Sequence, residues 1–384
     1  MRRLVSLVAV VVLVDTMLYA ALTPLLPHFV EEYDLSTTAA GLLVASYAIG
    51  VLTGAVPAGI ASARIGAKPA TLAGLLIIDA ASLGFAFADS VWALGIARFA
   101  QGLGSALSWA GGLAWLINAA PRSRRGELLG SALGAAIVGA LLGPVLGGVA
   151  SIVGAHVAFS GVAVLCVVVA LLGLREPGIA QEPARLDAVR RAFRDRQFVG
   201  GFGLMMLAAL LFGVLSVIAS LDLHRLGWGA VAIGAIFFIS ASFEAVFNVF
   251  VGRVTDRRGA LAPLRVVLPV GVAAALALGV ANNPYLIAGL IFVAAIAWGA
   301  LFTPGMVLLS SGADGVGLPQ GLAFGLMNGG WALGAIVGPA LGGLLSDVAG
   351  DVFAYGLGAL ACGLAFVAVT LAGTRTTRVP GPVR

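Results

Sequence analysis

Four ionisable residues lie well inside long apolar stretches of the sequence, namely Asp15, Asp79, Arg98 and Glu244. A charge at the centre of a lipid bilayer costs from about 3 kcal/mol to several times that amount, so each of these residues needs a partner or a task. A carboxyl group that binds a proton, and releases it when its access to water changes, is the minimum requirement for proton coupling. We therefore interpret all four as candidates for proton coupling. The alternative for each is a structural acid or base that holds helices together.

The composition places these residues in a membrane protein. Of the 384 residues, 60% are hydrophobic and 10% are charged, and the mean hydropathy is +1.08. A soluble domain carries about 25% charged residues, so this chain cannot cover a water-facing surface, and its expected partner is the lipid bilayer. The net charge of +5 does not indicate a nucleic-acid partner, because the basic residues lie in short loops between apolar runs.

The alternation of apolar runs and polar breaks predicts an all-α membrane protein with twelve transmembrane helices, because runs of about 20 apolar residues are long enough to cross the bilayer. The predicted helices cover residues 4–27, 37–60, 70–88, 91–118, 128–151, 155–174, 198–222, 229–252, 263–281, 285–309, 320–345 and 351–373. Asp15 falls near the middle of the first helix, Asp79 on the third, Arg98 on the fourth and Glu244 on the eighth.

One long hydrophilic stretch, residues 175–197, divides the twelve predicted helices equally. We interpret it as a linker between an N-terminal half (1–174) and a C-terminal half (198–373), which a tail (374–384) follows. Within the linker, residues 184–196 could form an amphipathic helix on the membrane surface. Arginines gather in alternate loops on the side of both termini, whereas the opposite loops carry mainly acids. The positive-inside rule then predicts a multi-pass protein of the cell membrane with both termini in the cytoplasm.

The two halves carry the same glycine pattern. The fifth predicted helix reads Gly130-x8-Gly139-x3-Gly143-Pro144-x2-Gly147-Gly148, and 195 residues further on the eleventh reads Gly325-x8-Gly334-x3-Gly338-Pro339-x2-Gly342-Gly343. At a displacement of 193, Gly41 matches Gly234, and Gly59 and Gly66 match Gly252 and Gly259. One such pattern serves ordinary helix packing, but its recurrence in register indicates a duplicated six-helix unit.

Several motifs resemble those of the major facilitator superfamily, and the resemblance covers nearly the whole chain. The loop after the second helix reads Gly59-Ile-Ala-Ser-Ala63-Arg64-Ile-Gly66-Ala67-Lys68, and its copy in the second half reads Gly252-Arg-Val-Thr-Asp256-Arg257-Arg258-Gly259. The fourth helix carries Arg98-Phe-Ala-Gln101-Gly102-Leu-Gly104, and the first carries Asp15-Thr-Met-Leu, followed by Pro24 and Pro27. Together with the glycine pattern, these motifs are similar to those of the twelve-helix drug:proton antiporters.

The resemblance implies the major facilitator fold, in which two pseudo-symmetric six-helix bundles rock about a central cavity. It implies that helices five and eight meet, that helices two and eleven meet, and that helices one and four bring Asp15 and Arg98 together as a switchable pair. Arg98 could instead lock the helix packing permanently. The residues that the resemblance assigns to conformational motifs are Gly59, Arg64, Gly66, Lys68, Gly139, Gly143, Pro144, Gly147, Gly148, Asp256, Arg257, Gly259, Gly338 and Pro339.

Two departures from the family pattern limit what the resemblance implies. Ala63 stands where the first loop motif has an acid, whereas Asp256 keeps the acid in the second half. Gly299 and Asn328 stand where vesicular amine transporters carry acids, so specificity for amines does not carry over.

Candidates for a substrate cavity are polar or aromatic residues on the predicted helices. The polar candidates are Asn328, Asn248 and Gln101, because an amide in lipid still needs a partner. Trp331 is the aromatic candidate, with core packing or lipid contact as its alternative role.

The sequence predicts a secondary transporter that exports a small apolar or amphipathic molecule, such as a drug or metabolite, in exchange for protons. The alternatives are a uniporter, a proton symporter for a sugar or metabolite, and a transport-inactive receptor or scaffold of this fold. We expect a monomer. We expect neither an enzyme nor a metal or other cofactor. His28, His156 and His224 all lie at the outer face, and no nucleophile–base or metal-ligand set occurs among the helices.

Overall fold

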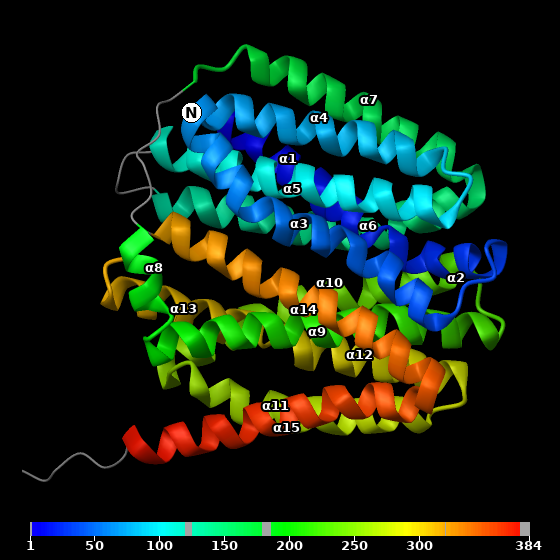
Figure 1. Ribbon diagram of the computed structural model, residues 1–384. Helices are drawn as coiled ribbons and strands as arrows, with labels where there is room; N and C mark the ends of the chain where they lie inside the picture. Colours follow the sequence, from blue (N-terminus) through cyan, green and yellow to red (C-terminus); the bar gives the residue numbers. More distant parts are fainter. Residues whose placement is uncertain (1, 120–124, 179–185, 319, 377–384) are drawn as a thin grey trace, which may run out of the picture.

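The computed structural model describes residues 2–119, 125–178, 186–318 and 320–376, and within these ranges the chain consists of α-helices and short turns (Figure 1). The helices are α1 (Arg2–Ala20), α2 (Leu22–Glu32), α3 (Thr37–Ile65), α4 (Ala67–Ala86), α5 (Val91–Ala119), α6 (Arg125–Val153), α7 (Ala155–Leu174), α8 (Leu186–Ala192), α9 (Arg196–Arg225), α10 (Ala230–Arg258), α11 (Leu261–Val280), α12 (Pro284–Gly299), α13 (Phe302–Gly315), α14 (Gln320–Ala349) and α15 (Asp351–Thr376). The first residues of α1, the last residues of α15 and α8 lie on one side of the molecule, which we call the terminal side; the opposite side is the distal side (Figure 1).

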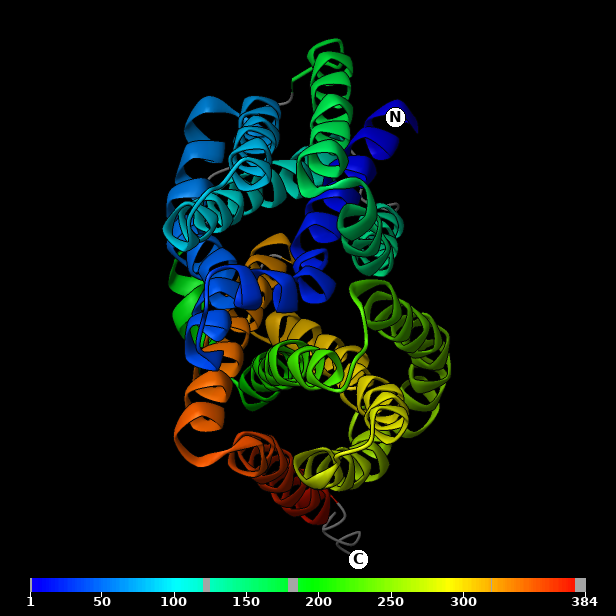
Figure 2. The same ribbon diagram turned by 90° about the vertical axis from the view of Figure 1, so that its right-hand side faces the viewer.

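The helices form two bundles, one built from α1–α7 and the other from α9–α15 (Figure 2). Eleven segments of the described residues are long and apolar enough to cross a membrane. α5 has 29 residues and packs between α3 and α4, so we count it as the twelfth span. The predicted all-α fold with two six-helix bundles is thus confirmed.

Two helices extend further toward the terminal side than the sequence predicted. α3 continues to Ile65 and α10 to Arg258, and in both cases the next residue is a glycine with positive φ, +95° at Gly66 and +83° at Gly259. L-residues rarely adopt this conformation, so glycine is the residue that ends a helix in this way. The two loop-motif glycines therefore fix where these helices stop.

Two spans predicted as single helices are each divided into two helices. The first breaks at Ala21, between α1 and α2, and the tenth breaks at Ala300 and Leu301, between α12 and α13. A proline follows each break, Pro24 and Pro304, and it cannot supply the backbone N–H that a continuous helix would donate to the carbonyl four residues earlier. The predicted surface helix at 184–196 is also shorter, because α8 covers only Leu186–Ala192, and residues 184 and 185 lie outside the described residues.

The repeated glycines bring one helix of each bundle close to another. In the first bundle, Gly139, Gly143 and Gly147 of α6 lie against the backbone of α1 and its junction with α2. In the second bundle, Gly334, Gly338 and Gly342 of α14 lie against α9 in the same way. A methyl group at most of these positions would overlap the neighbouring backbone, so the pattern serves close helix approach.

The bundles meet through matched contacts. Gly41 of α3 lies against the carbonyl of Pro339 on α14, and Gly234 of α10 lies against the carbonyl of Pro144 on α6. The two glycines are repeat partners, and so are the two prolines. The helix pairs α3–α14 and α6–α10, second with eleventh and fifth with eighth, are therefore in contact as the resemblance implied (Figure 2).

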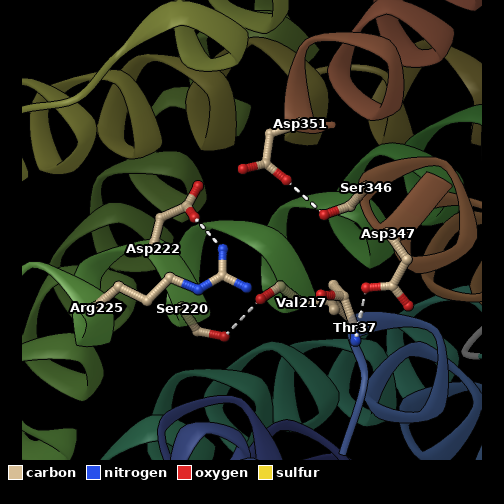
Figure 3. A network of polar contacts seen from close by, with 8 residues as sticks. All are labelled: Thr37, Val217, Ser220, Asp222, Arg225, Ser346, Asp347 and Asp351. Atoms are coloured by element: carbon tan, nitrogen blue, oxygen red, sulfur yellow. Dashed lines mark hydrogen bonds and ion pairs between the residues drawn. The ribbon is translucent and has the colours of Figure 1, made fainter. Parts of the chain in front are cut away.

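Polar contacts also join the bundles at the distal side (Figure 3). The Asp347 carboxylate of α14 accepts the backbone N–H groups of Thr37 (3.0 Å) and Thr38 (2.7 Å) and the Thr38 hydroxyl (2.6 Å). The Ser36 hydroxyl accepts the next N–H, that of Ala39, at 3.2 Å. Free N–H groups at a helix start need such acceptors, and here a residue of the second bundle caps a helix of the first. His224 Nε2 and Glu31 Oε1, 2.8 Å apart, add a second contact between the bundles.

Candidate functional site

Asp15 of α1 is 1% exposed and its carboxylate is surrounded by hydrogen-bond donors. The Tyr47 hydroxyl of α3 donates to Oδ1 at 2.7 Å. The Ser105 hydroxyl and the Trp109 indole N–H, four residues apart on α5, donate to Oδ2 at 2.8 and 2.7 Å. Three neutral side chains from two other helices therefore satisfy this buried acid.

Arg98 of α5, which is 2% exposed, serves the end of α1 and not Asp15. Its guanidinium donates to the carbonyls of Leu18 and Tyr19, both at 3.1 Å, and to Gln101 Oε1 at 3.0 Å. The two carbonyls belong to the last turn of α1, just before the break at Ala21, where a cation is favoured by the helix dipole. The expected direct pair of Asp15 with Arg98 is absent among the described contacts, and the arginine instead caps a broken helix.

Tyr47 connects the acid and the arginine. While its hydroxyl binds Asp15, its ring centre lies 4.9 Å from Arg98 Cζ, a cation–π contact. The ring of Tyr19 lies 4.9 Å from that of Tyr47 and 5.1 Å from that of Trp331. Because Trp331 belongs to α14, an aromatic contact joins the Asp15 site to the second bundle.

Gln101 and Asp79 occupy different surroundings in the first bundle. Gln101 is buried, with its amide N–H donating to Ser82 Oγ at 3.0 Å and its oxygen bound by Arg98, so it positions the arginine. Asp79 of α4 is 8% exposed, and its Oδ1 has no hydrogen-bond partner among the described residues. Asp79 makes none of the contacts that hold Asp15.

The candidates of the second bundle lie apart from Asp15. Glu244 of α10 packs against Gly299 at the end of α12, and Asn248, one turn further on, accepts a hydrogen bond from the Thr303 hydroxyl at 3.1 Å. Asn328 is half-buried on α14, one turn before Trp331. Within the described residues no group of three or more His, Cys, Asp and Glu side chains could hold a metal ion.

The loop-motif residues lie on the terminal side. Lys68 Nζ donates to the carbonyls of Leu174 (2.8 Å) and Glu176 (2.6 Å), so it caps the end of α7. Arg64, Asp256 and Arg257 are exposed.

The sequence did not identify Tyr47, Ser105 or Trp109 as hydrogen-bond partners of Asp15. A usable signal was the spacing on α5: Arg98, Gln101, Ser105 and Trp109 recur at three or four residues and thus share one helix face.

Comparison with known proteins agrees with the fold described above. The family model described as Major Facilitator Superfamily matches residues 8–318. The chain belongs to the major facilitator superfamily. Among the similar proteins, Multidrug resistance protein 2 of Bacillus subtilis (strain 168) is 26% identical over 360 residues, which cover 87% of this chain and 88% of that protein. The MFS-type transporter ppzB of Metarhizium rileyi (strain RCEF 4871) is 30% identical over 133 residues, which cover 33% of this chain and only 28% of the fungal protein.

Solved structures of transporters share the fold. A bacterial homologue of the human lysosomal transporter Spinster, inward-facing and occupied, matches with a TM-score of 0.72 at 16% identity, covering 96% of this chain and 94% of that one. Its unoccupied inward-facing form matches with a TM-score of 0.69 at 15% identity. These structures show the fold, and membership of the major facilitator superfamily makes the chain a multi-pass membrane transporter and not an enzyme.

Proposed function

We propose that this transporter exports a small apolar or amphipathic molecule, such as a drug or metabolite, in exchange for protons that bind Asp15. The observation that carries the proposal is the way in which Asp15 is held. Its partners are the neutral groups of Tyr47, Ser105 and Trp109, whereas the two terminal nitrogens of Arg98 donate to carbonyl oxygens and not to Asp15. Asp15 can therefore take up a proton without leaving a buried arginine unpaired, which would be strongly destabilising.

Proton binding at Asp15 would rearrange its hydrogen bonds. A hydroxyl can donate or accept, whereas the indole N–H of Trp109 can only donate. A protonated Asp15 needs an acceptor, and only Tyr47 or Ser105 among its three partners can turn its hydroxyl to provide one. If Tyr47 turns, the change reaches the ring that supports Arg98 and touches Tyr19, and through Tyr19 it reaches Trp331 of the second bundle.

Several features support export from the cytoplasm. The arginine-rich loops favour the terminal side as the cytoplasmic side of the cell membrane, and the distal contacts at Asp347 and Glu31 then close the outer side in this conformation. Similarity to a Bacillus protein named for multidrug resistance supports drugs or metabolites as the substrate class. We infer that the halves 1–174 and 198–373 rock as units about the linker, and that one chain is the transporting unit. Glu244 and Asp79 remain further candidates for proton binding.

The test starts from a drug and metabolite susceptibility panel on strains that lack or overexpress the protein, which identifies a substrate. With that substrate, purified protein in liposomes is expected to show transport driven by a pH gradient, and Asp15→Asn is expected to abolish it. Asp89→Asn, which removes an exposed acid from the loop before α5, is the matched control and keeps full activity. Full gradient-driven transport by the Asp15 variant would refute the role of this residue. Transport that ignores a collapsed gradient would indicate a uniporter.

A further inference from the structure

The break in the tenth span lies at the middle of that span. The span Pro284–Gly315 has 32 residues, and α12 ends at Gly299 while α13 begins at Phe302. Since Pro304 has no N–H, the carbonyl of Ala300 lacks the helical partner that it would otherwise have. A free carbonyl in an apolar environment needs another partner, from the protein, from water or from a bound ion.

Glu244 faces this break. It lies midway along the 29-residue α10, and its carboxyl group occupies the space that a side chain at Gly299 would fill. Among the described residues it forms no hydrogen bond and no ion pair. The residue as a whole is partly exposed.

The neighbouring polar groups at the break supply oxygen atoms. Asn248 and Thr303 bind each other at 3.1 Å, one turn beyond Glu244 and in the first turn of α13. Carboxylate, amide, hydroxyl and carbonyl oxygens are the ligands of small hard cations. The surroundings of Glu244 thus offer mainly oxygen atoms, whereas the carboxylate of Asp15 already accepts hydrogen bonds from three donors.

We propose that Glu244 and the break between α12 and α13 form a second site for a small monovalent cation, a proton or a sodium ion, separate from Asp15. A proton would bind a carboxylate oxygen, and the resulting O–H could donate to the free carbonyl at the break. A sodium ion would take the same oxygens as ligands. This site rests on the proposed antiport and adds a second ion to it, because an acid then lies near a helix break in each half.

The experiment measures binding and needs no transported substrate. Thermal unfolding of the purified full-length protein in detergent is followed while sodium replaces choline at constant ionic strength, at several pH values. A cation that binds the folded protein alone raises its melting temperature as the ion concentration rises. We expect a rise of several degrees in the wild type and in Asp15→Asn, and its loss in Glu244→Gln.

The two ions give different patterns. For a sodium site, sodium raises the melting temperature and acidification competes with it. For a proton site, acidification raises the melting temperature and sodium adds nothing. If the melting temperature depends on sodium and on pH in the same way in the wild type and in Glu244→Gln, the proposal is overturned.

A second variant tests whether the ion response of Glu244→Gln is lost through misfolding and not through loss of ion binding. In Gly299→Ala the new methyl group would displace the flexible Glu244 carboxyl from the break while its charge stays. We expect this variant to need a higher ion concentration for the same stabilisation, and an unchanged ion response would overturn the proposal too. If the wild type binds the ion at Glu244 but shows no gradient-driven transport, the proposed antiport fails and the site stands.

Discussion

At the scale of single residues, the donors around Asp15 set how easily this acid is protonated. Tyr47→Phe removes one donor and keeps the ring that touches Arg98 and Tyr19. A hydrogen bond to a charged group contributes about 1.5–3 kcal/mol, and about 1.4 kcal/mol corresponds to one pH unit. Because the charged form loses this support, we expect the pH profile of transport to move about one to two units toward higher pH.

The pH profile is measured with the same substrate and liposomes as for Asp15→Asn. Tyr285→Phe is the control, because the side chain of Tyr285 is 77% exposed at the start of α12, far from Asp15 along the chain. A Tyr47→Phe profile that coincides with that of the wild type would show that the hydroxyl does not support the charged form.

The sequence could predict which residues of this site are charged, but not which neutral residues hold them. Asp15 and Arg98 stand out because a charge in an apolar run is conspicuous. Tyr47 is 32 positions from Asp15 and Trp109 is 94 positions away, and neither differs from an ordinary residue of a membrane helix. For a related reason the sequence could not predict that Asp15 and Arg98 make no direct contact in this conformation, because the two carbonyl oxygens that Arg98 binds become available only at the break in α1.

At the scale of helices, the cap that α14 provides for α3 is a closing contact between the bundles. Replacing a capping side chain with alanine costs about 0.5–2 kcal/mol. In Asp347→Ala this energy is lost only when the distal side is closed, so the ratio of closed to open molecules is expected to fall about 2- to 30-fold. Spin labels at Glu32→Cys and Val348→Cys, exposed positions on the distal ends of the two bundles, report the separation.

Asp351→Ala is the matched control for this variant. Asp351 lies four residues after Asp347 and binds the Ser346 hydroxyl at 2.5 Å, a contact within the second bundle (Figure 3). It should leave the distribution of label distances unchanged. Equal distributions in Asp347→Ala and Asp351→Ala would mean that the cap does not hold the bundles together.

Helix number and the duplication of the six-helix unit were predictable because apolar length and a repeated glycine pattern are properties of the chain alone, whereas the helix pairing followed from the resemblance to the family. The two helix breaks were not predicted, although each is marked in the sequence by Pro24, or by Gly299 with Pro304. A proline often lies inside a continuous membrane helix, as Pro144 and Pro339 do here. Whether a proline breaks its helix depends on the neighbours that bind the free polar groups at the break, and at the first break Arg98 binds the carbonyls of Leu18 and Tyr19.

At the scale of the whole molecule, a symmetric scaffold carries an asymmetric set of charges. The contacts of Gly41 with Pro339 and of Gly234 with Pro144 are copies of one another, so the two interfaces between the bundles are built alike. In the proposed rocking motion, one interface can loosen while the other tightens. The set of hydrogen bonds around Asp15 has no such copy, because Asp15, Arg98 and Tyr47 all belong to the first bundle and Glu244 has no comparable donors among the described residues. A structural change at Asp15 is therefore expected to reach the second bundle through a contact that has no copy in the other half of the chain.

The contact of Tyr19 with Trp331 meets this requirement, and it predicts a separation of proton binding from transport. Trp331→Ala removes the ring that lies 5.1 Å from Tyr19 but leaves every hydrogen bond of Asp15 in place. We expect the maximum rate of gradient-driven transport to fall while the pH profile keeps its midpoint, the opposite of Tyr47→Phe. Trp331→Phe, which keeps an aromatic face, should restore most of the rate. A shifted midpoint with an unchanged maximum rate would place Trp331 in proton binding and leave the link between the bundles to other residues.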